Sequence, residues 1–510
     1  MLRHASRLEG VFILFSSLLL GVTTLTLASM ETRWLVFFAA GVLLCVAAAV
    51  FGFDRIMTIA FVVGLSVDAH YYLTTPPPVL MWTGTTTPGA LSIPLALVPG
   101  LLLLGRRIAL NRLTGARLDW GLDISIPLGW YFAASLIAIL LSSFWFPGLC
   151  VIWQGVMLFL LFLIMLNVVR SRQDASTVVH LLLIVLLGQC FVFILQIGLG
   201  ISFNAVGKVQ QIATEGTVWH SASGTAAATT AGFAMFLDPL VMLAYVLFRT
   251  VPASGRRTLY GALFLLGATV LALTLNRSTW LAFPLGIGLA ERLLRRRGLV
   301  SVSGETHRRR GLTIAPVIVL VIFVLVAPMF QSVRKSNHEE DLQQRFDLMK
   351  PAMAMIVRHP VFGIGPGSYG FLLREYAVAS GYQGWLYIAH NDYLLIWAER
   401  GTVALLVWIL FLRAAGREFL ATSRRPHPWD AAVGVGALSG FAMQLWEVFW
   451  TSSMGFSAYG VMYVVLGVCA ALNRHVGLPA SAATRASTPD AELSADRRAD
   501  VMAIVAARSA

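Results

Sequence analysis

Long, uninterrupted runs of apolar residues constrain this chain more than any other feature. The runs recur along most of the sequence, at residues 11–28, 35–53, 128–141, 151–169, 178–199, 259–275, 312–330 and 402–412. Several reach or approach the roughly 20 residues that an α-helix needs to cross a bilayer. Only 12% of the 510 residues are charged, too few to cover the surface of a soluble protein of this length. We therefore expect an all-α, polytopic integral membrane protein with about fourteen transmembrane helices.

The positive charge of the chain is distributed unevenly between its connecting segments. The formal net charge is +13, carried mainly by arginines that cluster in alternate segments such as 106–117, 292–297 and 413–425. The intervening segments 142–148 and 450–455 are nearly uncharged. This positive-inside pattern predicts a multi-pass protein of the bacterial inner membrane with both termini in the cytoplasm. Because the arginines mark topology, a nucleic-acid partner is disfavoured.

The same alternation suggests how the chain is organised. Residues 1–475 are expected to form one multi-helix membrane domain, in which the run 11–28 is a retained first helix. After Arg474 the composition changes to Ala, Ser, Asp and Arg, so residues 476–510 are expected to be a disordered cytoplasmic tail. One long periplasmic loop, 331–389, is expected to carry short helices. Since the other outside loops are short, this loop should carry function.

Three successive features stand out in the long loop. Residues 344–360 are read as a helix lying on or near the membrane, and a glycine-rich turn at 361–370 ends it. The apolar residues of this helix recur at helical spacing and could face lipid or the bundle: Phe346, Met349, Met353 and Ile356. The pair His390-Asn391 then opens the next membrane helix.

These residues resemble the O-antigen ligase and polymerase family of bacterial envelope glycosyltransferases. The family pattern has an arginine opening a helix, a Pro-x-x-Gly-x-Gly turn, and a His-Asn pair entering a membrane helix that contains Gly. The matching positions are Arg345, residues 360–365, His390-Asn391 and Gly401. Upstream, Arg277 lies in a segment similar to the family's arginine-bearing turn, with Ser and Arg in swapped order. The resemblance covers roughly residues 200–415 at the level of motifs.

The resemblance implies a transfer reaction outside the cytoplasm. Family members move a glycan from an undecaprenyl-diphosphate carrier to a hydroxyl acceptor, and this activated donor requires neither nucleotide nor cofactor. The planar fork of arginine suits phosphate, so Arg277 and Arg345 are the candidates for holding the diphosphate. His390 is the candidate for taking the proton of the acceptor hydroxyl, or alternatively donates a hydrogen bond to the diphosphate. No metal-ligand spacing occurs, and metal is not expected.

Ordinary structural roles remain open for each of these residues. Arg277 could be a helix-end arginine that extends to the lipid headgroups. Arg345 could pair with Asp341 or Asp347 on a solvated surface. The His-Asn pair could be a plain helix N-terminus that Asn391 caps.

Further residues are candidates for binding substrate, and several have an alternative role. Gly363 and Gly365 are expected to set backbone geometry, with a phosphate cradle as the alternative. Glu447 lies in an apolar run, where it could be functional or pair with Arg277 or Arg345. The full set is Asn391, Gly363, Gly365, Arg358, His220 and Glu447.

Several functions fit this pattern. We favour polymerisation of O-antigen or exopolysaccharide, followed by ligation to lipid A core and then by protein O-glycosylation, with saccharide, lipid A core or protein as the acceptor. A transporter or flippase of an anionic solute or lipid-linked saccharide is the alternative from another class. Its charged site should lie near the bilayer midplane on broken helices, whereas the three catalytic candidates are expected at the outer interface. A non-catalytic assembly protein is a third possibility.

Overall fold

The computed structural model describes most of the chain. The described residues are 32–67, 69–74, 90–200, 210–214, 217–227, 229–252, 254–299, 343, 345–382, 386–451 and 456–476. The predicted apolar helices at 11–28 and 312–330, and the tail from residue 477 onward, lie outside them.

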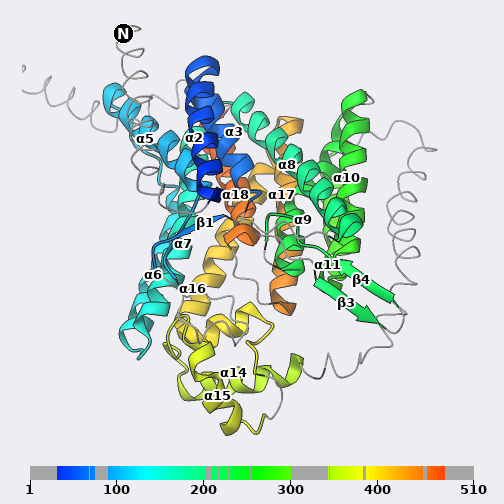
Figure 1. Ribbon diagram of the computed structural model, residues 1–510. Coiled ribbons are helices and arrows are strands. Elements are labelled where there is room, and N and C mark those ends of the chain that lie inside the picture. The colour runs from blue at the N-terminus through cyan, green and yellow to red at the C-terminus, as the bar shows by residue number, and fades with distance from the viewer. Residues whose placement is uncertain are drawn as a thin grey trace, which may run out of the picture.

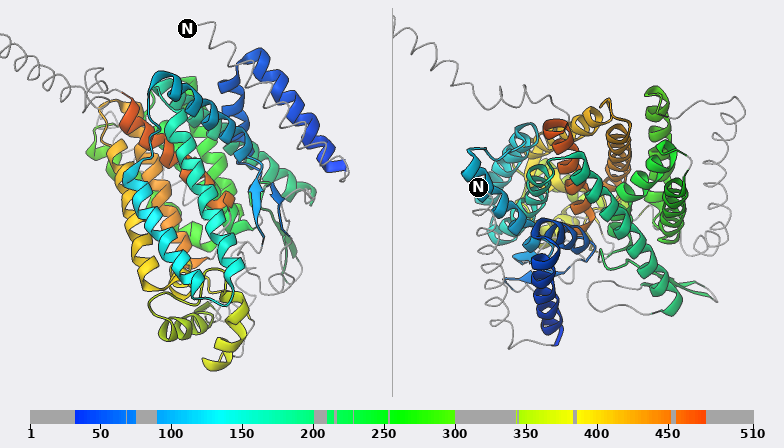
Figure 2. Two further views of the ribbon diagram at one scale, coloured as in Figure 1. Left: turned by 90° about the vertical axis from the view of Figure 1, so that its left-hand side faces the viewer. Right: turned by 90° about the horizontal axis from the view of Figure 1, so that it is seen from above.

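The described part of the chain is largely helical (Figures 1 and 2). Its helices are α2 (Thr32–Phe51), α3 (Phe53–Gly64), α5 (Leu97–Thr114), α6 (Leu122–Leu140), α7 (Trp145–Val168), α8 (Arg172–Leu199), α9 (Thr230–Thr250), α10 (Gly255–Leu273), α11 (Arg277–Arg296), α14 (Met349–Arg358), α15 (Tyr369–Ala379), α16 (Asp392–Thr422), α17 (Pro428–Trp450) and α18 (Phe456–His475). Within the described residues, seven helices are long and apolar enough to cross a membrane, namely α6 to α10, α16 and α17. A multi-pass membrane protein is therefore confirmed, and the total of about fourteen spans stays a prediction.

Helix α9 lies at the centre of the bundle. Of its most apolar stretch, 89% is buried inside the protein. It packs against α17 at very short range, because a Cβ atom at Gly440 would lie 2.5 Å from the Cα atom of Pro239. Small residues allow two membrane helices to approach this closely. The bundle is thus built around a helix that is mostly apolar around its circumference, which is typical of a buried position.

A second region lies beyond one end of the bundle, and we call it the cap. It comprises residues 345–382 and 386–400, with α14, α15 and the first part of α16, at the bottom of Figure 1. The cap has its own apolar core, which includes Met355, Ile364, Tyr369, Leu373 and Leu395. The long loop thus carries short helices as predicted, and its periplasmic location stays a prediction.

Helix α16 joins the cap to the bundle and is interrupted between them. Gly401 has φ 75° and ψ 179°, which separates an outer part, 392–400, from an inner part, 402–422. The backbone N–H of Thr402 donates to the carbonyl of Pro360 at 2.9 Å, so the break is held by the turn that follows α14. A side chain at Gly401 would overlap the Val361 carbonyl. Glycine is therefore required here by both conformation and space.

Two short strand pairs depart from the all-α expectation. Strand β1 (His70–Tyr72) pairs with β2 (Ser92–Pro94), and β3 (Gln210–Thr214) pairs with β4 (Thr217–Ser221), both antiparallel. Strands this short give little periodic signal in a sequence. They leave the fold class helical in its main elements.

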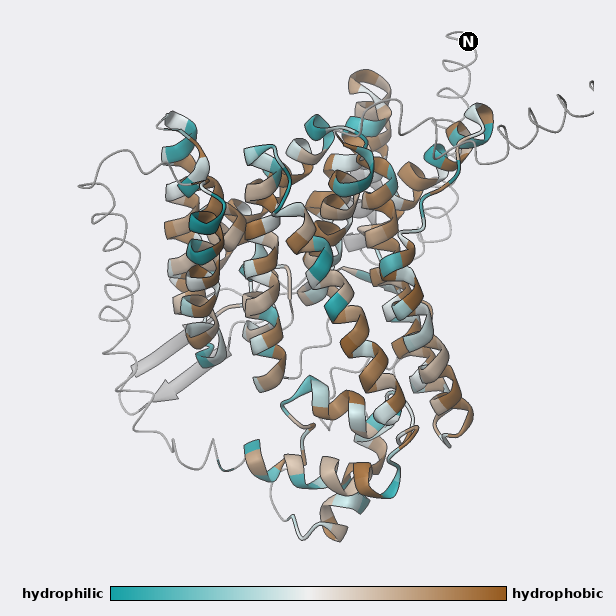
Figure 3. Ribbon diagram, turned by 180° about the vertical axis from the view of Figure 1, so that it is seen from behind, coloured by the Kyte–Doolittle hydropathy of each residue, from teal (hydrophilic) through white to brown (hydrophobic). Residues whose placement is uncertain are grey.

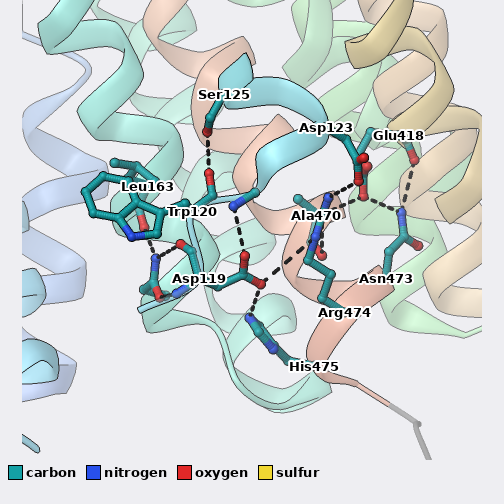
Figure 4. A network of polar contacts seen from close by, with 12 residues as sticks. Asp119, Trp120, Asp123, Ser125, Leu163, Glu418, Ala470, Asn473, Arg474 and His475 are labelled. Carbon is teal, nitrogen blue, oxygen red and sulfur yellow. Dashed lines mark hydrogen bonds and ion pairs between the residues drawn. The ribbon is translucent and has the colours of Figure 1, made fainter. Parts of the chain in front are cut away.

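Polar and charged residues gather at the end of the bundle opposite the cap (Figure 3). Figure 4 shows a network there in which Arg474 contacts Asp123 at 3.0 Å and Glu418 at 3.0 Å. Asn473 also donates to Glu418, at 2.8 Å. The arginine-rich segments thus lie at one end, in keeping with the distribution read from the sequence; which compartment that end faces stays a prediction.

Candidate active site

Arg345 is attached to the last turn of α17. Its Nη1 atom donates to the carbonyl oxygen of Trp450 at 3.1 Å. Asp347, one of the two acids considered as its partner, forms an ion pair with Lys350 at 2.7 Å. The hydrogen bond from Lys350 lowers the pKa of Asp347. The guanidinium of Arg345 is therefore brought to the bundle, at a carbonyl that ends a membrane helix.

Arg277 is the first residue of α11 and follows a strained turn. Leu275 has φ 57°, which among the described residues is the one positive φ outside glycine. The amide of Asn276 donates to the Thr279 hydroxyl at 2.9 Å, and the Ser278 hydroxyl donates to Asn276 Oδ1 at 2.9 Å. These polar contacts fix the backbone on both sides of Arg277.

Glu447 connects this turn to α17. Its side chain is fully buried and accepts a hydrogen bond from the Thr279 hydroxyl. The carboxyl group of Asp238, also fully buried on α9, interacts with it. The contacts of Glu447 described here are with Thr279 and Asp238; its alternative pairing with Arg277 or Arg345 stays a prediction. Glu447 therefore holds the arginine-bearing turn against α17.

His390 and Asn391 have different environments. The His390 ring stacks on Tyr387 with centroids 5.1 Å apart. The Asn391 side chain accepts a hydrogen bond from the N–H of Leu394 at 2.9 Å and so caps α16. This is the capping role given above as the alternative to a functional one. The next turn is tied to α17, because the Tyr393 hydroxyl donates to the Leu445 carbonyl at 3.2 Å.

The three candidate catalytic residues are thus connected to one element. Arg345 contacts Trp450, the turn of Arg277 is bonded through Thr279 to Glu447, and the helix that His390 opens is bonded through Tyr393 to Leu445. Two of the three come from the cap and the third from the bundle.

The glycine-rich turn is packed tightly against the break in α16. The N–H of Gly365 donates to the Glu399 carbonyl at 2.8 Å, and that of Gly363 donates to the His359 carbonyl at 3.0 Å. Both glycines have positive φ, and a side chain at Gly363 would overlap the Glu399 backbone. These two donors are already used within the protein, so the geometry favours the structural role of the turn over a phosphate cradle.

Glu399 is a buried acid that the sequence analysis did not single out. Its carboxylate accepts hydrogen bonds from the N–H groups of Gly367 and Tyr369, the latter at 3.3 Å. The Glu399 carboxylate thereby binds the N-terminus of α15 and holds the glycine-rich turn against α16. In the sequence, the position of this acid two residues before Gly401 could have identified it as a candidate.

Arg358 and His220 lie apart from these contacts. Arg358 is exposed on α14, with its guanidinium 5.1 Å from the centre of the Tyr376 ring and 3.9 Å from Glu375. His220 lies in β4, where its backbone is opposite Gln211. Their predicted contact with substrate stays a prediction.

A cavity of about 130 Å³ opens between α6, α7, α16, α17 and α18. Most of its wall is apolar, from residues such as Leu128, Leu158, Trp408 and Phe441. Its polar lining residues include Asp392, Tyr459, Arg400, Tyr131 and Gln444. Asp392 immediately follows the His390-Asn391 pair in the chain, so the cavity adjoins the start of α16.

Arg400 and Asp392 are the charged groups of this cavity. The Tyr459 hydroxyl donates to Asp392 at 2.5 Å, and Arg400 donates to the Tyr131 hydroxyl. Arg400 is only 3% exposed, and its Nε atom has no partner among the described residues. A buried ionisable group beside an apolar cavity is a candidate functional residue. The i, i+4, i+8 spacing of Asp392, Ile396 and Arg400 could have identified this face of the helix.

The comparisons with known proteins agree with these motifs. Residues 262–409 match a family model described as O-antigen ligase. The matched segment contains Arg277, Arg345, the glycine-rich turn and the His-Asn pair. No curated protein matches the chain. In the described residues no three His, Cys, Asp or Glu side chains lie close enough to hold a metal ion. The resemblance to the O-antigen ligase/polymerase family is thus confirmed for residues 262–409, the segment that carries these motifs.

Proposed function

We propose that this protein transfers or polymerises glycan from an undecaprenyl-diphosphate-linked donor at the junction of the cap and the bundle. The observation that carries the proposal is the attachment of Arg345, the Arg277 turn and the His390 helix to the last two turns of α17. An apolar cavity adjoins this point, as a lipid-linked donor requires. The cap face would then be periplasmic.

Arg277 and Arg345 would bind the diphosphate from two sides. Arg345 belongs to the cap and contacts the end of α17, and Arg277 belongs to the bundle as the first residue of α11. Hydrogen bonds to a charged group contribute roughly 1.5–3 kcal/mol each. Arginine is the residue best suited to hold phosphate oxygens in a fixed geometry. The two guanidinium groups would also stabilise the charge that develops on the leaving diphosphate.

In the transfer step, the oxygen of the acceptor hydroxyl forms a bond to the anomeric carbon of the donor. The bond between that carbon and the phosphate oxygen breaks, and the lipid diphosphate leaves. His390 accepts the proton of the hydroxyl. Burial raises the pKa of Tyr387, the residue on which His390 stacks, so this phenol stays neutral and cannot act as the base. Its role is to orient the imidazole.

The cavity would hold the part of the isoprenoid chain nearest the diphosphate. Its apolar wall suits a hydrocarbon chain, and Asp392 in its lining follows His390 by two positions in the chain. A lipid bound there would present its diphosphate near the two catalytic arginines. Among acceptors we favour the saccharide of a second donor, which makes the protein a polymerase, with ligation next and protein O-glycosylation third.

A transporter or flippase is the second candidate, because one observation favours it. Helix α16 is broken at Gly401, next to the buried Arg400, and broken helices that carry charged groups are typical of transporter binding sites. The backbone at the break is nevertheless bonded to the cap turn, through Thr402 and the Pro360 carbonyl, which supports the enzyme.

The glycan profile of a deletion strain tests the proposal. The strain is complemented with wild type, H390A or R277A at matched membrane levels. Polymer with wild type and single repeat units with both variants indicate a polymerase. Long polymer stranded on the lipid carrier indicates a ligase. Full restoration by both variants contradicts the catalytic site and favours the transporter or an assembly role.

A further inference from the structure

A second pocket lies at the end of the bundle opposite the cap. It has a volume of about 680 Å³ and lies between α3, α5 and the connection from α7 to α8. Its lining includes four arginines and two aspartates, which are Arg55, Arg106, Arg107, Arg170, Asp54 and Asp174. None of these residues takes part in the transfer site.

The two acids of this pocket are already engaged. Asp54 forms an ion pair with Arg106. Asp174 accepts hydrogen bonds from the backbone N–H groups of Ser171 at 2.9 Å and Arg170 at 3.1 Å. These bonds cap the start of α8. The four arginines of the pocket therefore face two acids that already have other partners, and a third acid, Asp119, lies near Arg170.

Arg107 and Arg170 lie close enough to affect each other. The buried Nε atom of Arg107 has no hydrogen-bond partner among the described residues. Arg170 donates from Nε to the Asn167 carbonyl at 3.0 Å and from Nη2 to Asn167 Oδ1 at 3.4 Å, and its Nη1 atom lies 3.2 Å from His475 Nε2. Burial, and then the neighbouring Arg107, lower the pKa of Arg170 to about 10, so it stays charged at neutral pH. Two crowded cations with an unused buried donor indicate room for an anion.

The surroundings of the pocket are apolar and face outward. Phe53, Met57 and Leu103 form a small core at its rim. On the adjacent α2, Val50 and Phe51 are 68% and 66% exposed. A basic pocket beside such helices, at the end where the arginines cluster, is the setting in which anionic headgroups bind while their acyl chains lie along the helices.

We propose that this pocket binds the phosphate headgroup of an anionic phospholipid. The phosphate accepts hydrogen bonds from Arg107 and Arg170, and Arg55 at the exposed rim adds long-range attraction. The proposal does not depend on the transfer chemistry, because the pocket lies at the other end of the bundle.

The test uses the full-length protein in detergent micelles and native mass spectrometry. Phosphatidylglycerol and phosphatidylcholine with identical acyl chains are titrated into wild type, R107Q and R256Q. Arg256 is exposed at the start of α10 and is the matched control. We expect wild type and R256Q to retain phosphatidylglycerol preferentially, and R107Q to bind its tightest phosphatidylglycerol at least about tenfold more weakly.

A variant at the exposed rim of the pocket tests the proposal even if R107Q fails to fold. R55Q removes an exposed charge and should weaken phosphatidylglycerol binding by about fivefold, since one cation near a lipid surface contributes about 1 kcal/mol. Equal retention of the two lipids by wild type, or unchanged binding by both R107Q and R55Q, overturns the proposal. Displacement of phosphatidylglycerol by millimolar inorganic phosphate also overturns it, because the pocket would then serve a soluble anion.

Discussion

The bundle and the cap are stabilised by different means. In the bundle, α9 is buried on all sides and contacts α17 through glycine, so stability comes from the close packing of long apolar helices. The cap has a small core and is held to the bundle by specific contacts, including the Thr402 to Pro360 hydrogen bond at 2.9 Å. The two regions meet at the candidate catalytic residues. Changes in the bundle core should therefore remove folded protein, whereas changes at the junction should remove activity and leave the protein in the membrane.

The largest effect is expected from H390A. Loss of a general base lowers the rate by about 100- to 10,000-fold, because the proton must then go to water. His359 provides the control, since it lies in the cap but bonds to the Tyr376 hydroxyl at 2.9 Å. H359A should retain most of the transfer rate, measured as polymer formed per unit of membrane protein. Equal rates for the two variants would remove His390 from the mechanism.

The next effect concerns the two arginines on either side of the junction. R345A and R277A should each reduce transfer by roughly 10- to 100-fold, the equivalent of one or two charge-assisted hydrogen bonds. Arg374, exposed on α15, serves as the control, and R374A should behave as wild type. If R277A reduced transfer and R345A did not, the cap would not contribute to the site. That result would contradict the view that the site lies between cap and bundle.

Replacement of the glycine at the break should act through the docking of the cap. G401A places a methyl group against the Val361 carbonyl and forces alanine to φ 75°. The strain costs about 1–3 kcal/mol. We expect a lower thermal midpoint and about tenfold less transfer. G416A is the control on the same helix, because its Cβ atom would lie 3.7 Å from Phe441. A midpoint for G401A as high as that of G416A would show that the junction tolerates movement of α16.

The smallest effect is expected at Ser142, between α6 and α7. Its hydroxyl donates to the Ile364 carbonyl at 3.0 Å and lies 3.1 Å from the Ser368 hydroxyl. S142A should lower stability by about 1 kcal/mol, since the adjoining Phe144 to Phe371 stacking remains. Thermal unfolding in detergent measures this. A loss as large as that of G401A would mean that this hydrogen bond, rather than the break, holds the cap.

The bundle could be predicted well where apolar runs are continuous. The run 178–199 became α8, and 151–169 became α7 with a start six residues earlier. Helix α9 gave a weaker signal because Asp238 and Pro239 interrupt its apolar stretch. The strand pairs gave no signal in the sequence, since strands of three to five residues carry too little periodicity.

The cap and the site were only partly predictable. The helix expected at 344–360 is α14, Met349–Arg358, and its buried face is formed by Ala352, Met355 and Ile356, whereas Phe346 and Met353 are exposed. Helix α15 was not anticipated, because its start depends on Glu399 from a distant segment. Motifs identified Arg277, Arg345 and His390, but their common attachment to α17 depends on contacts between residues far apart in the chain.

The affinity for the lipid-diphosphate donor tests most directly whether cap and bundle form one site. Binding of a defined undecaprenyl-diphosphate-linked saccharide is titrated with purified wild type, R277A, R345A and the double variant. Because both arginines would hold one diphosphate, each single variant should bind the donor more weakly than wild type. The double variant should lose less binding free energy than the two single variants lose together, with a coupling free energy of about 1 kcal/mol or more. Wild-type donor affinity in both single variants would contradict the account.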